Sequence, residues 1–311
     1  MSIETYIENF HGLKVKEYNP KEELADAEEY AWRLSISWEE AEKQNLKISQ
    51  KFAPLFNDPA VQQIQALVIG PWGEEWEENP QEVINLLIKN KEALKALKAL
   101  FVGDITYEDC EMSWIQQGDY SELLKAYPGL EELRIRGAAI RLGNAGHAGL
   151  KKLIVESGGL SSTVPHDICT STFPELTHLE LWLGVEEYGF DGSMETIKKC
   201  VAAFSSGKLT YLGLKNSEIV DDIAKFLADH DILSTLDVLD LSLGTLTDEG
   251  AQALLDSKKI RSLKQLILRH HYMSKGMCKK LASLPVDCDC SAPQEAEEYD
   301  GEIYRTVFVS E

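Results

Sequence analysis

Residues 236–255 read LDVLDLSLGTLTDEGAQALL, and this stretch decides the fold of the chain. Its Leu239 is the middle member of a column, Leu212, Leu239 and Leu266, whose members are spaced 27 residues apart. Four more apolar columns keep the same spacing: Leu209/Leu236/Leu263, Leu214/Leu241/Leu268, Ile219/Leu246/Met273 and Leu227/Leu254/Leu281. A fixed period of this length predicts a solenoid, in which each unit buries its apolar face against its neighbours.

Within this stretch the spacing predicts a short strand followed by a helix. Leu239 and Leu241 alternate with polar residues, so they point to one face of a strand and Asp240 points to the other. Thr247 then offers a side-chain oxygen that can cap a helix, and that helix carries Leu254 on its buried face. Each repeat is therefore expected to contribute one strand and one helix.

The same LxxLxL frame recurs along most of the chain. Its fourth-position residues are Leu34, Leu67, Leu100, Leu133, Leu153, Leu179, Leu212, Leu239 and Leu266. A tenth, degenerate strand is expected at LPVDCDC, with Val286 and Cys288 in the two inward positions. The ninth position of the frame is neither Asn nor Cys in these units. It is occupied by Ala138, Gly158, Gly184, Ser217, Gly244 and His271 in successive units, so no continuous asparagine ladder is expected.

This pattern resembles the leucine-rich repeat, specifically its ribonuclease-inhibitor-like type. The sequence as a whole, including the segment FHGLKV near its start, is similar to uncharacterised bacterial leucine-rich repeat proteins. The resemblance implies a right-handed α/β horseshoe with a parallel concave sheet, convex helices and a binding role. We expect one domain over 1–311, with an N-terminal cap at 1–30, about nine to ten irregular repeats at 31–290 and a C-terminal cap at 291–311. The caps offer candidate strands at 13–18 and 303–309.

Charge restricts the classes of partner. Lys plus Arg number 31 against 52 Asp plus Glu, which gives a formal net charge of −21. Such a field repels phosphate backbones and anionic bilayers, so nucleic acid and membrane are not expected as partners. We expect the negative charge mainly to keep a monomer soluble, although it would also favour binding to a cation-rich patch on a protein partner. The N-terminus lacks the features of a signal peptide, and a cytoplasmic location is expected.

Cysteine and histidine are the side chains that could form a metal site or a catalytic site in this sequence. Cys288 and Cys290 lack the second ligand pair that a structural zinc site needs, so we expect reduced thiols and no metal. His270 and His271 have no partner acid and nucleophile arranged around them, and His271 is expected to fill the ninth position of its repeat. No catalytic residue and no cofactor are therefore expected.

The concave face is the candidate binding surface, because outward strand positions of adjacent repeats lie about 4.8 Å apart and form one surface. The candidate residues are Arg134, Arg136, Glu156, His178, Glu180, Trp182, Tyr211, Lys215, Asp240 and Arg269. Trp182, Tyr211 and Arg136 are the side-chain types most enriched at binding hot spots. An exposed Trp182 would have no packing reason on a sheet face, which favours a contact role.

The sequence thus predicts a non-catalytic protein–protein interaction module or scaffold that binds a partner on its concave face. Two alternatives stay open: an enzyme with a concave-face site, and a self-assembling structural module that joins copies through an uncapped end. An open horseshoe offers mostly shallow surface, which disfavours the enzyme. The fold does not select the partner.

Overall fold

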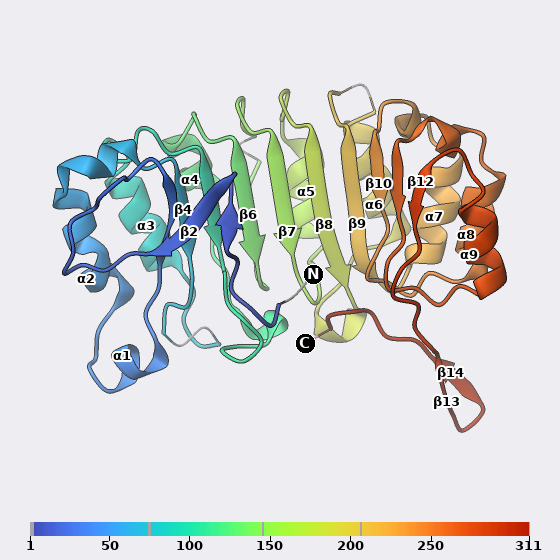
Figure 1. Cartoon of the computed structure of the whole chain (residues 1–311), viewed down its shortest axis with the longest axis horizontal. Helices are drawn as coiled ribbons and strands as arrows, with labels where there is room; N and C mark the ends of the chain where they lie inside the picture. The colour runs from blue at the N-terminus through green and yellow to red at the C-terminus, as the bar shows by residue number, and fades with distance from the viewer. Residues whose placement is uncertain (1–2, 74–75, 145, 206, 311) are drawn as a thin grey trace. The chain divides into compact units, whose positions relative to one another are not determined.

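The computed structural model describes residues 3–73, 76–144, 146–205 and 207–310, which form two compact units. Unit 1 comprises Met1–Leu153 and Ser171–Glu175, and unit 2 comprises Ile154–Thr170 and Leu176–Glu311. In both units strands alternate with helices, as Figure 1 shows. The chain is an α/β leucine-rich repeat solenoid, as the apolar columns predict. The expectation of a single domain with two caps stays a prediction.

Unit 1 contains a sheet whose strands pair in sequence order. Its strands are β1 (Asn9–Phe10), β2 (Leu13–Glu17), β3 (Tyr30–Leu34), β4 (Ala66–Ile69), β5 (Ala99–Val102) and β6 (Glu132–Arg136). Its helices are α1 (Trp38–Glu42), α2 (Ile48–Phe52), α3 (Gln81–Lys89) and α4 (Ser121–Ala126), with 3₁₀ turns at η1 (Ala53–Asn57), η2 (Pro59–Gln63) and η3 (Met112–Trp114). The pairs from β2 to β6 are parallel, and β1 pairs antiparallel with β2.

The register of unit 1 corrects one detail of the sequence prediction. Leu67 lies opposite Leu100, and Leu100 lies opposite Leu133, as expected. On β3, however, Trp32 lies opposite Leu67, and Leu34 lies opposite Ile69. The first repeat is therefore shifted by two residues relative to the predicted register. Because side chains alternate along a strand, a shift of two residues leaves every side chain on its predicted face.

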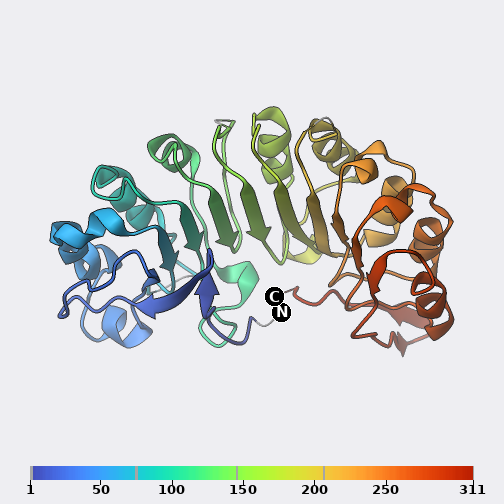
Figure 2. The same ribbon diagram turned by 45° about the horizontal axis from the view of Figure 1, so that its top comes forward.

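The helices of unit 1 lie on one side of its strands, and the N-terminal hairpin folds onto the other, as Figure 2 shows. We call this second side the helix-free face; it is the face that the sequence predicts to be concave. Phe10 of β1 packs there against Phe101 with ring centroids 6.1 Å apart. The buried cluster under the hairpin consists of Phe10, Ala31, Ala66, Val68, Ala99 and Phe101. The chain itself therefore covers the helix-free face over β3 to β5.

Unit 2 has the more regular repeats. Its strands are β8 (His178–Gly184), β9 (Tyr211–Ser217), β10 (Val238–Asp240), β11 (Gln265–Ile267) and β12 (Asp287–Asp289), and β7 (Lys152–Glu156) lies at the boundary between the units. Its helices are α5 (Thr163–Thr170), α6 (Met194–Ala203), α7 (Val220–Ala228), α8 (Asp248–Asp256) and α9 (Lys275–Leu281), with 3₁₀ turns at η4 (Glu186–Tyr188), η5 (Asp231–Ser234) and η6 (Lys259–Ser262). A separate hairpin consists of β13 (Glu297–Tyr299) and β14 (Glu302–Tyr304).

The 27-residue columns are the core of unit 2. Leu212, Leu239 and Leu266 lie opposite one another on β9, β10 and β11, and all three are buried. The Thr247 side chain accepts a hydrogen bond from the backbone N–H of Glu249, so α8 begins at Asp248 as predicted. Strand, turn and capped helix thus follow from the same stretch of sequence.

The last repeat corrects a second register. Leu266 lies opposite Cys288, so Cys288 rather than Val286 takes the first inward position of β12. The Cys288 and Cys290 sulfur atoms lie 3.5 Å apart. His271 is fully buried; its Nδ1 accepts from the N–H of Met273 at 3.1 Å, and its Nε2 donates to the Cys290 carbonyl at 2.9 Å. The prediction that His271 fills the ninth position is confirmed.

The C-terminal segment differs from the edge strand expected over 303–309. Only its first residues belong to β14, which pairs with β13. The following residues pass along unit 2, where the Asn216 side chain donates to the Val309 carbonyl at 2.5 Å and accepts from its N–H at 2.9 Å. Val307 and Val309 are buried. This segment is held by the side chain of Asn216 on β9 and by the Phe308 N–H, which donates to the Leu243 carbonyl at 2.8 Å, rather than by pairing with a strand of the main sheet.

Candidate functional site

In unit 2 the helices also lie on one side of the strands, as Figure 2 shows, and we call the other side the helix-free face of unit 2. The ten candidate residues belong to the helix-free faces of the two units. Arg134 and Arg136 lie on β6, Glu156 on β7, His178, Glu180 and Trp182 on β8, Tyr211 and Lys215 on β9, and Asp240 on β10, while Arg269 follows β11. Trp182 faces Lys215 in register, and Glu180 and Asp240 both face Gly213. The candidate residues of β8, β9 and β10 therefore lie on neighbouring strands in register, and their role in binding stays a prediction.

Burial separates these residues into two groups. Arg136, Glu156, Glu180, Trp182, Lys215 and Asp240 are buried, whereas Arg134, His178 and Tyr211 are partly exposed and Arg269 is exposed. Trp182 has a relative exposure of 0%, so the premise that it is an exposed tryptophan is wrong. Its indole N–H donates to Glu180 Oε1 at 2.7 Å, and the Lys215 ammonium lies 5.2 Å from its ring centroid. These contacts give the ring the packing reason that the sequence did not reveal.

A compact charged cluster forms around Gly213 in unit 2. Lys215 Nζ lies 3.1 Å from Glu180 Oε1 and 3.4 Å from Asp240 Oδ2. The Tyr211 hydroxyl lies 3.0 Å from Glu180 and 2.8 Å from Asp240, so it donates to one carboxylate at a time. A Cβ atom on Gly213 would lie within 3.4 Å of Tyr211, Glu180 and Lys215 side chains. The missing side chain therefore leaves the room in which the two carboxylates meet their partners.

The electrostatics of this cluster hold it in one charge state. Burial alone would raise the pKa of Glu180, but the contacts with His178, Lys215 and Trp182 outweigh it and hold the pKa well below its usual value. Burial, followed by the charges of Glu180 and Asp240, raises the pKa of Tyr211. The Tyr211 hydroxyl therefore stays protonated and acts as a hydrogen-bond donor. The His178 ring stacks on the Tyr211 ring with centroids 3.8 Å apart.

Glu180, Lys215, Tyr211 and Asp240 thus satisfy one another, while the buried His178 Nε2 lies 3.7 Å from Glu180 Oε2 without a hydrogen-bond partner. Two carboxylates share one ammonium and one hydroxyl, and these groups make one another's hydrogen bonds. A buried polar network of this kind fixes the local structure when its members are satisfied. The stacked rings of His178 and Tyr211 are the part of the cluster that solvent reaches on the helix-free face. Arg269 lies outside the cluster and pairs with Asp289.

In unit 1 the two arginine candidates pack on an aromatic ring. The guanidinium carbon atoms of Arg134 and Arg136 lie 4.3 Å and 5.4 Å from the Phe101 ring centroid. Arg136 also donates to the Ile105 carbonyl at 3.0 Å. These contacts anchor the loop that follows β5, so Arg136 is better described as a residue that positions this loop.

Several exposed aromatic residues of unit 1 were not among the candidates predicted from the sequence. Tyr6, Trp38, Trp76, Tyr107 and Trp114 keep between 37% and 55% of their surface exposed. Trp38, Trp76 and Tyr107 lie in the segments that follow β3, β4 and β5. Because parallel strands end at the same edge of a sheet, these segments leave the same edge of unit 1. Aromatic residues soon after each apolar strand were the signal in the sequence.

A pocket of about 540 Å³ lies among these segments. We call it the Trp38–Trp76 pocket, and it is lined by Tyr6, Glu17, Ser35, Ile36, Ser37, Trp38, Glu40, Lys51, Pro71, Gly73, Trp76, Glu108 and Asp109. Trp38 opens α1, whose cap Ser37 accepts from the N–H of Glu40. Near Trp76 in the chain, the Trp72 indole N–H donates to the Glu78 carbonyl at 2.9 Å. Trp38 is therefore placed at the capped start of a helix.

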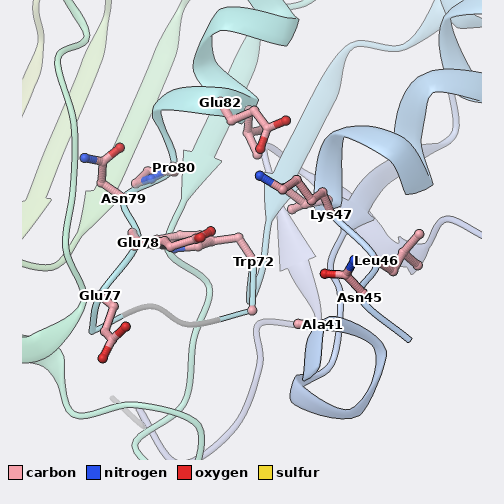
Figure 3. Close-up of a pocket in the computed structure, with 13 residues that line it drawn as sticks. Ala41, Asn45, Leu46, Lys47, Trp72, Glu77, Glu78, Asn79, Pro80 and Glu82 are labelled. Atoms are coloured by element: carbon pink, nitrogen blue, oxygen red, sulfur yellow. Dashed lines mark hydrogen bonds between the residues drawn. The ribbon is translucent and has the colours of Figure 1, made fainter. Parts of the chain in front are cut away.

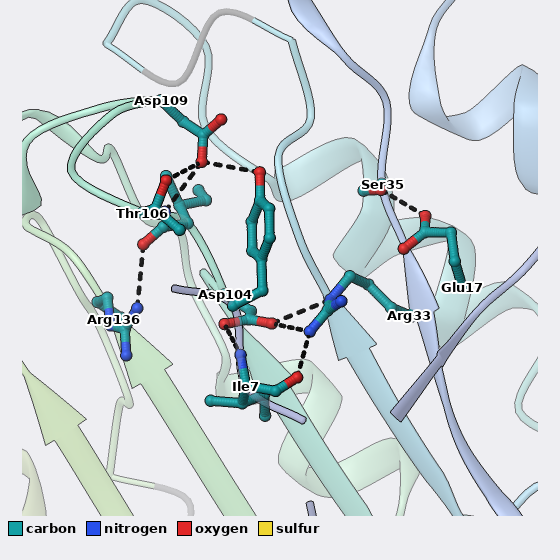
Figure 4. Close-up of polar contacts among 10 residues, drawn as sticks. Ile7, Glu17, Arg33, Ser35, Asp104, Thr106, Asp109 and Arg136 are labelled. Carbon is teal, nitrogen blue, oxygen red and sulfur yellow. Dashed lines mark hydrogen bonds and ion pairs between the residues drawn. The ribbon is translucent and has the colours of Figure 1, made fainter. Parts of the chain in front are cut away.

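Figure 4 shows a network of buried charge beside Glu17, Ser35 and Asp109, which line this pocket. Arg33 donates through Nε and Nη2 to Asp104 Oδ2 at 3.0 and 2.6 Å. The N–H of Ile7 donates to Asp104, and the Ile7 carbonyl accepts from Arg33. Burial raises the pKa of Asp104, although the charges of Arg33 and Arg136 oppose this shift. The N-terminal segment is thereby held against β3 and β5.

A second pocket of about 490 Å³ adjoins the first and shares Gly73 with it. We call it the Trp72 pocket, which Figure 3 shows; it is lined by Ala41, Asn45, Leu46, Lys47, Ile48, Trp72, Gly73, Glu77, Glu78, Asn79, Pro80, Glu82 and Val83. Gly73 has φ +129°, a conformation that side-chain-bearing residues rarely adopt, and a Cβ there would lie 3.0 Å from Ala41. Glycine thus lets this loop approach α1 between the pockets.

The two pockets offer hydrogen-bonding and charged groups. Within the described ranges, no group of three or more His, Cys, Asp or Glu side chains is placed to hold a metal ion. The structure also describes no helix that is long and apolar enough to cross a membrane. The predicted absence of a metal and of a cofactor stays a prediction.

Comparison with known proteins finds likenesses among solved structures. The structure matches the crystal structure of a Bacteroides fragilis protein, determined by a structural genomics consortium, at a TM-score of 0.79 and 34% sequence identity. The match covers 89% of this chain and 76% of that chain. An internalin from Listeria monocytogenes matches at a TM-score of 0.40 and 16% identity, over 78% of this chain and 57% of that chain. No protein-family model matches the sequence, and no curated protein matches it.

Proposed function

This chain belongs to the same family as the Bacteroides fragilis protein, and from its own surface we propose that it is a non-catalytic protein-interaction module that binds its partner at the Trp38–Trp76 pocket. One observation carries this proposal. Tyr6, Trp38 and Trp76 line a pocket while keeping 37%, 51% and 42% of their surface exposed. Large aromatic side chains left in water gain little for the fold and are enriched at binding hot spots.

A second candidate surface is the helix-free face of unit 2. Trp182 lies below this surface, but the His178–Tyr211 stack and Arg269 are accessible. Tyrosine and arginine are enriched at interfaces, which favours these residues as a second contact. The concave-face hypothesis therefore rests on these three side chains and no longer on Trp182.

The finer assignments are part of the same proposal. A helix follows each of the strands β8 to β11, which supports the ribonuclease-inhibitor-like type of repeat. We propose a cytoplasmic monomer, in keeping with the cysteines of the described residues, which form no disulfide: Cys110, Cys169, Cys200, Cys278, Cys288 and Cys290. The likeness to a Bacteroides fragilis protein supports a bacterial origin.

The proposal is tested by capturing partners from a lysate of the native host on the immobilised chain and quantifying them by mass spectrometry. Three baits are compared: the unaltered chain, the Trp38→Ala/Trp76→Ala variant and the His178→Ala/Arg269→Ala variant. A partner retained by the unaltered chain should be lost from the first variant and kept by the second. Thermal unfolding of all three baits establishes that each is folded.

The reverse result, with binding lost only from the His178→Ala/Arg269→Ala variant, would move the interface to the helix-free face of unit 2. Turnover of a substrate by the unaltered chain would contradict a non-catalytic role. Light scattering over a concentration series distinguishes partner binding from self-assembly, because a self-assembling module increases in mass with concentration.

A further inference from the structure

We propose that the Trp38–Trp76 pocket and the adjoining Trp72 pocket bind lysine or arginine side chains from a basic segment of the protein partner. This inference rests on the proposed function and adds the chemistry of the partner to it. Its support comes from the shape, the charge and the aromatic lining of the two pockets.

The shape suits side chains presented by an extended segment. The two pockets have volumes of about 540 Å³ and 490 Å³, within the range of sites that hold small ligands. They share Gly73, so they lie next to each other on unit 1. One stretch of chain with more than one long side chain can therefore reach both.

The charge of the lining is strongly negative. The Trp38–Trp76 pocket has the carboxylates of Glu17, Glu40, Glu108 and Asp109 against one ammonium, that of Lys51. Lys51 already lies 2.9 Å from Glu40 and donates to the Ser35 carbonyl, so its charge is engaged within the pocket wall. The Trp72 pocket has the carboxylates of Glu77, Glu78 and Glu82 against one ammonium, that of Lys47. Cationic guests complement both pockets, whereas polyanions are repelled.

The aromatic lining points to the same guests. The face of an aromatic ring attracts cations, and the effect is stronger where water is excluded. The chain itself already uses these rings in this way: the Arg33 guanidinium lies 5.0 Å from the Tyr6 ring centroid, and the Lys43 ammonium lies 5.9 Å from that of Trp38. Trp38 keeps 51% of its surface exposed, which leaves ring surface for a further cation. Carboxylates beside exposed tryptophans thus select a cation on a flexible chain.

The test uses an eight-residue peptide with four lysines, and its analogue in which every lysine is acetylated. Binding to the full chain is measured by isothermal titration calorimetry. The lysine peptide should bind, and the acetylated peptide should not, because acetylation removes the charge and keeps the length. Trp38→Ala or Trp76→Ala should weaken binding about tenfold or more.

Two matched controls separate the pocket from the overall negative charge. Trp114 is as exposed as Trp38 but does not line the pocket, so Trp114→Ala should change the affinity less than about twofold. Glu108→Gln and Glu122→Gln remove the same charge, one inside the pocket and one on α4. The first should weaken binding about threefold or more and the second should not.

Equal effects of the pocket and control variants would overturn the inference, because the peptide would then respond to net charge alone. Binding of the acetylated peptide would overturn it as well. Either result leaves the protein-binding proposal intact if the captured partner still depends on Trp38 and Trp76. Capture that is independent of both tryptophans would instead contradict the proposed function itself.

Discussion

Lys215 Nζ lies 3.1 Å from Glu180 Oε1, and the two side chains are only 1% and 8% exposed. This ion pair lies beneath Tyr211 and beside Trp182, on the face that the sequence predicts to bind a partner. Burying two charges is favourable only when both are paired and hydrogen-bonded, as they are in this cluster. The pair therefore accounts for why this part of the surface is packed rather than open.

Removing the ammonium should destabilise the fold. Lys215→Ala leaves Glu180 buried without its cation, and the free energy of unfolding in urea should fall by about 3–5 kcal/mol. Lys225→Ala removes a lysine from the exposed surface of α7, where it pairs with Asp222 and Glu249, and should leave the stability unchanged within error. Equal effects of the two substitutions would mean that Lys215 is solvated.

The stability should depend on pH through Glu180. Its pKa is lowered in the folded state from the usual 4.5, so its contribution to stability is complete above pH 4.5 and is lost as the pH falls toward the folded pKa. The difference in unfolding free energy between the unaltered chain and Glu180→Gln should therefore shrink from about pH 6 to about pH 3. A difference that stays constant over this range would contradict the lowered pKa.

Trp182 should matter for folding. Trp182→Ala removes a fully buried ring and should cost about 3–5 kcal/mol in urea unfolding. Trp182→Phe keeps an aromatic ring but loses the N–H that donates to Glu180, and should cost about 1.5–3 kcal/mol. A cost below about 1 kcal/mol for the alanine variant would place the ring in solvent.

His271 should be replaceable by the residue that the repeat family uses at its position. His271→Ala leaves the N–H of Met273 and the carbonyl of Cys290 without their side-chain partner, at a cost of about 1–3 kcal/mol for each buried group. His271→Asn supplies both a donor and an acceptor and should recover part of this loss. If both variants unfold at the same temperature, the ring acts by filling space alone.

The thiols near the C-terminus should not need a metal. Purified protein is expected to carry much less than one equivalent of zinc and to keep its melting temperature in a chelator. The measurements are elemental analysis and thermal unfolding with and without EDTA. Zinc near one equivalent that is lost together with the fold would show that Cys288 and Cys290 belong to a structural site.

Most of the fold could be predicted because its information is periodic. The column of Leu212, Leu239 and Leu266 lies in register in β9 to β11, as its 27-residue spacing indicates. The first repeat was misplaced by two residues because Trp32 and Leu34 are both apolar and share one face of β3. A period-two pattern identifies the face of a strand and leaves its register open to such shifts.

The site could be predicted only in part, for two physical reasons. The face of Trp182 follows from alternation, but its burial depends on how Lys215 and Glu180 extend over it, which no spacing encodes. Trp38 and Trp76 lie in segments between strands, where no period marks them. Their proximity arises because parallel strands end at the same edge of the sheet.

Amide hydrogen exchange of the chain, with and without the captured partner, tests the location of the interface most directly. The account predicts slower exchange on binding in residues 34–42 and 102–110, which frame the Trp38–Trp76 pocket, and unchanged exchange in residues 178–182 and 211–215. Protection confined to residues 178–182 and 211–215, with none around the pocket, would contradict it.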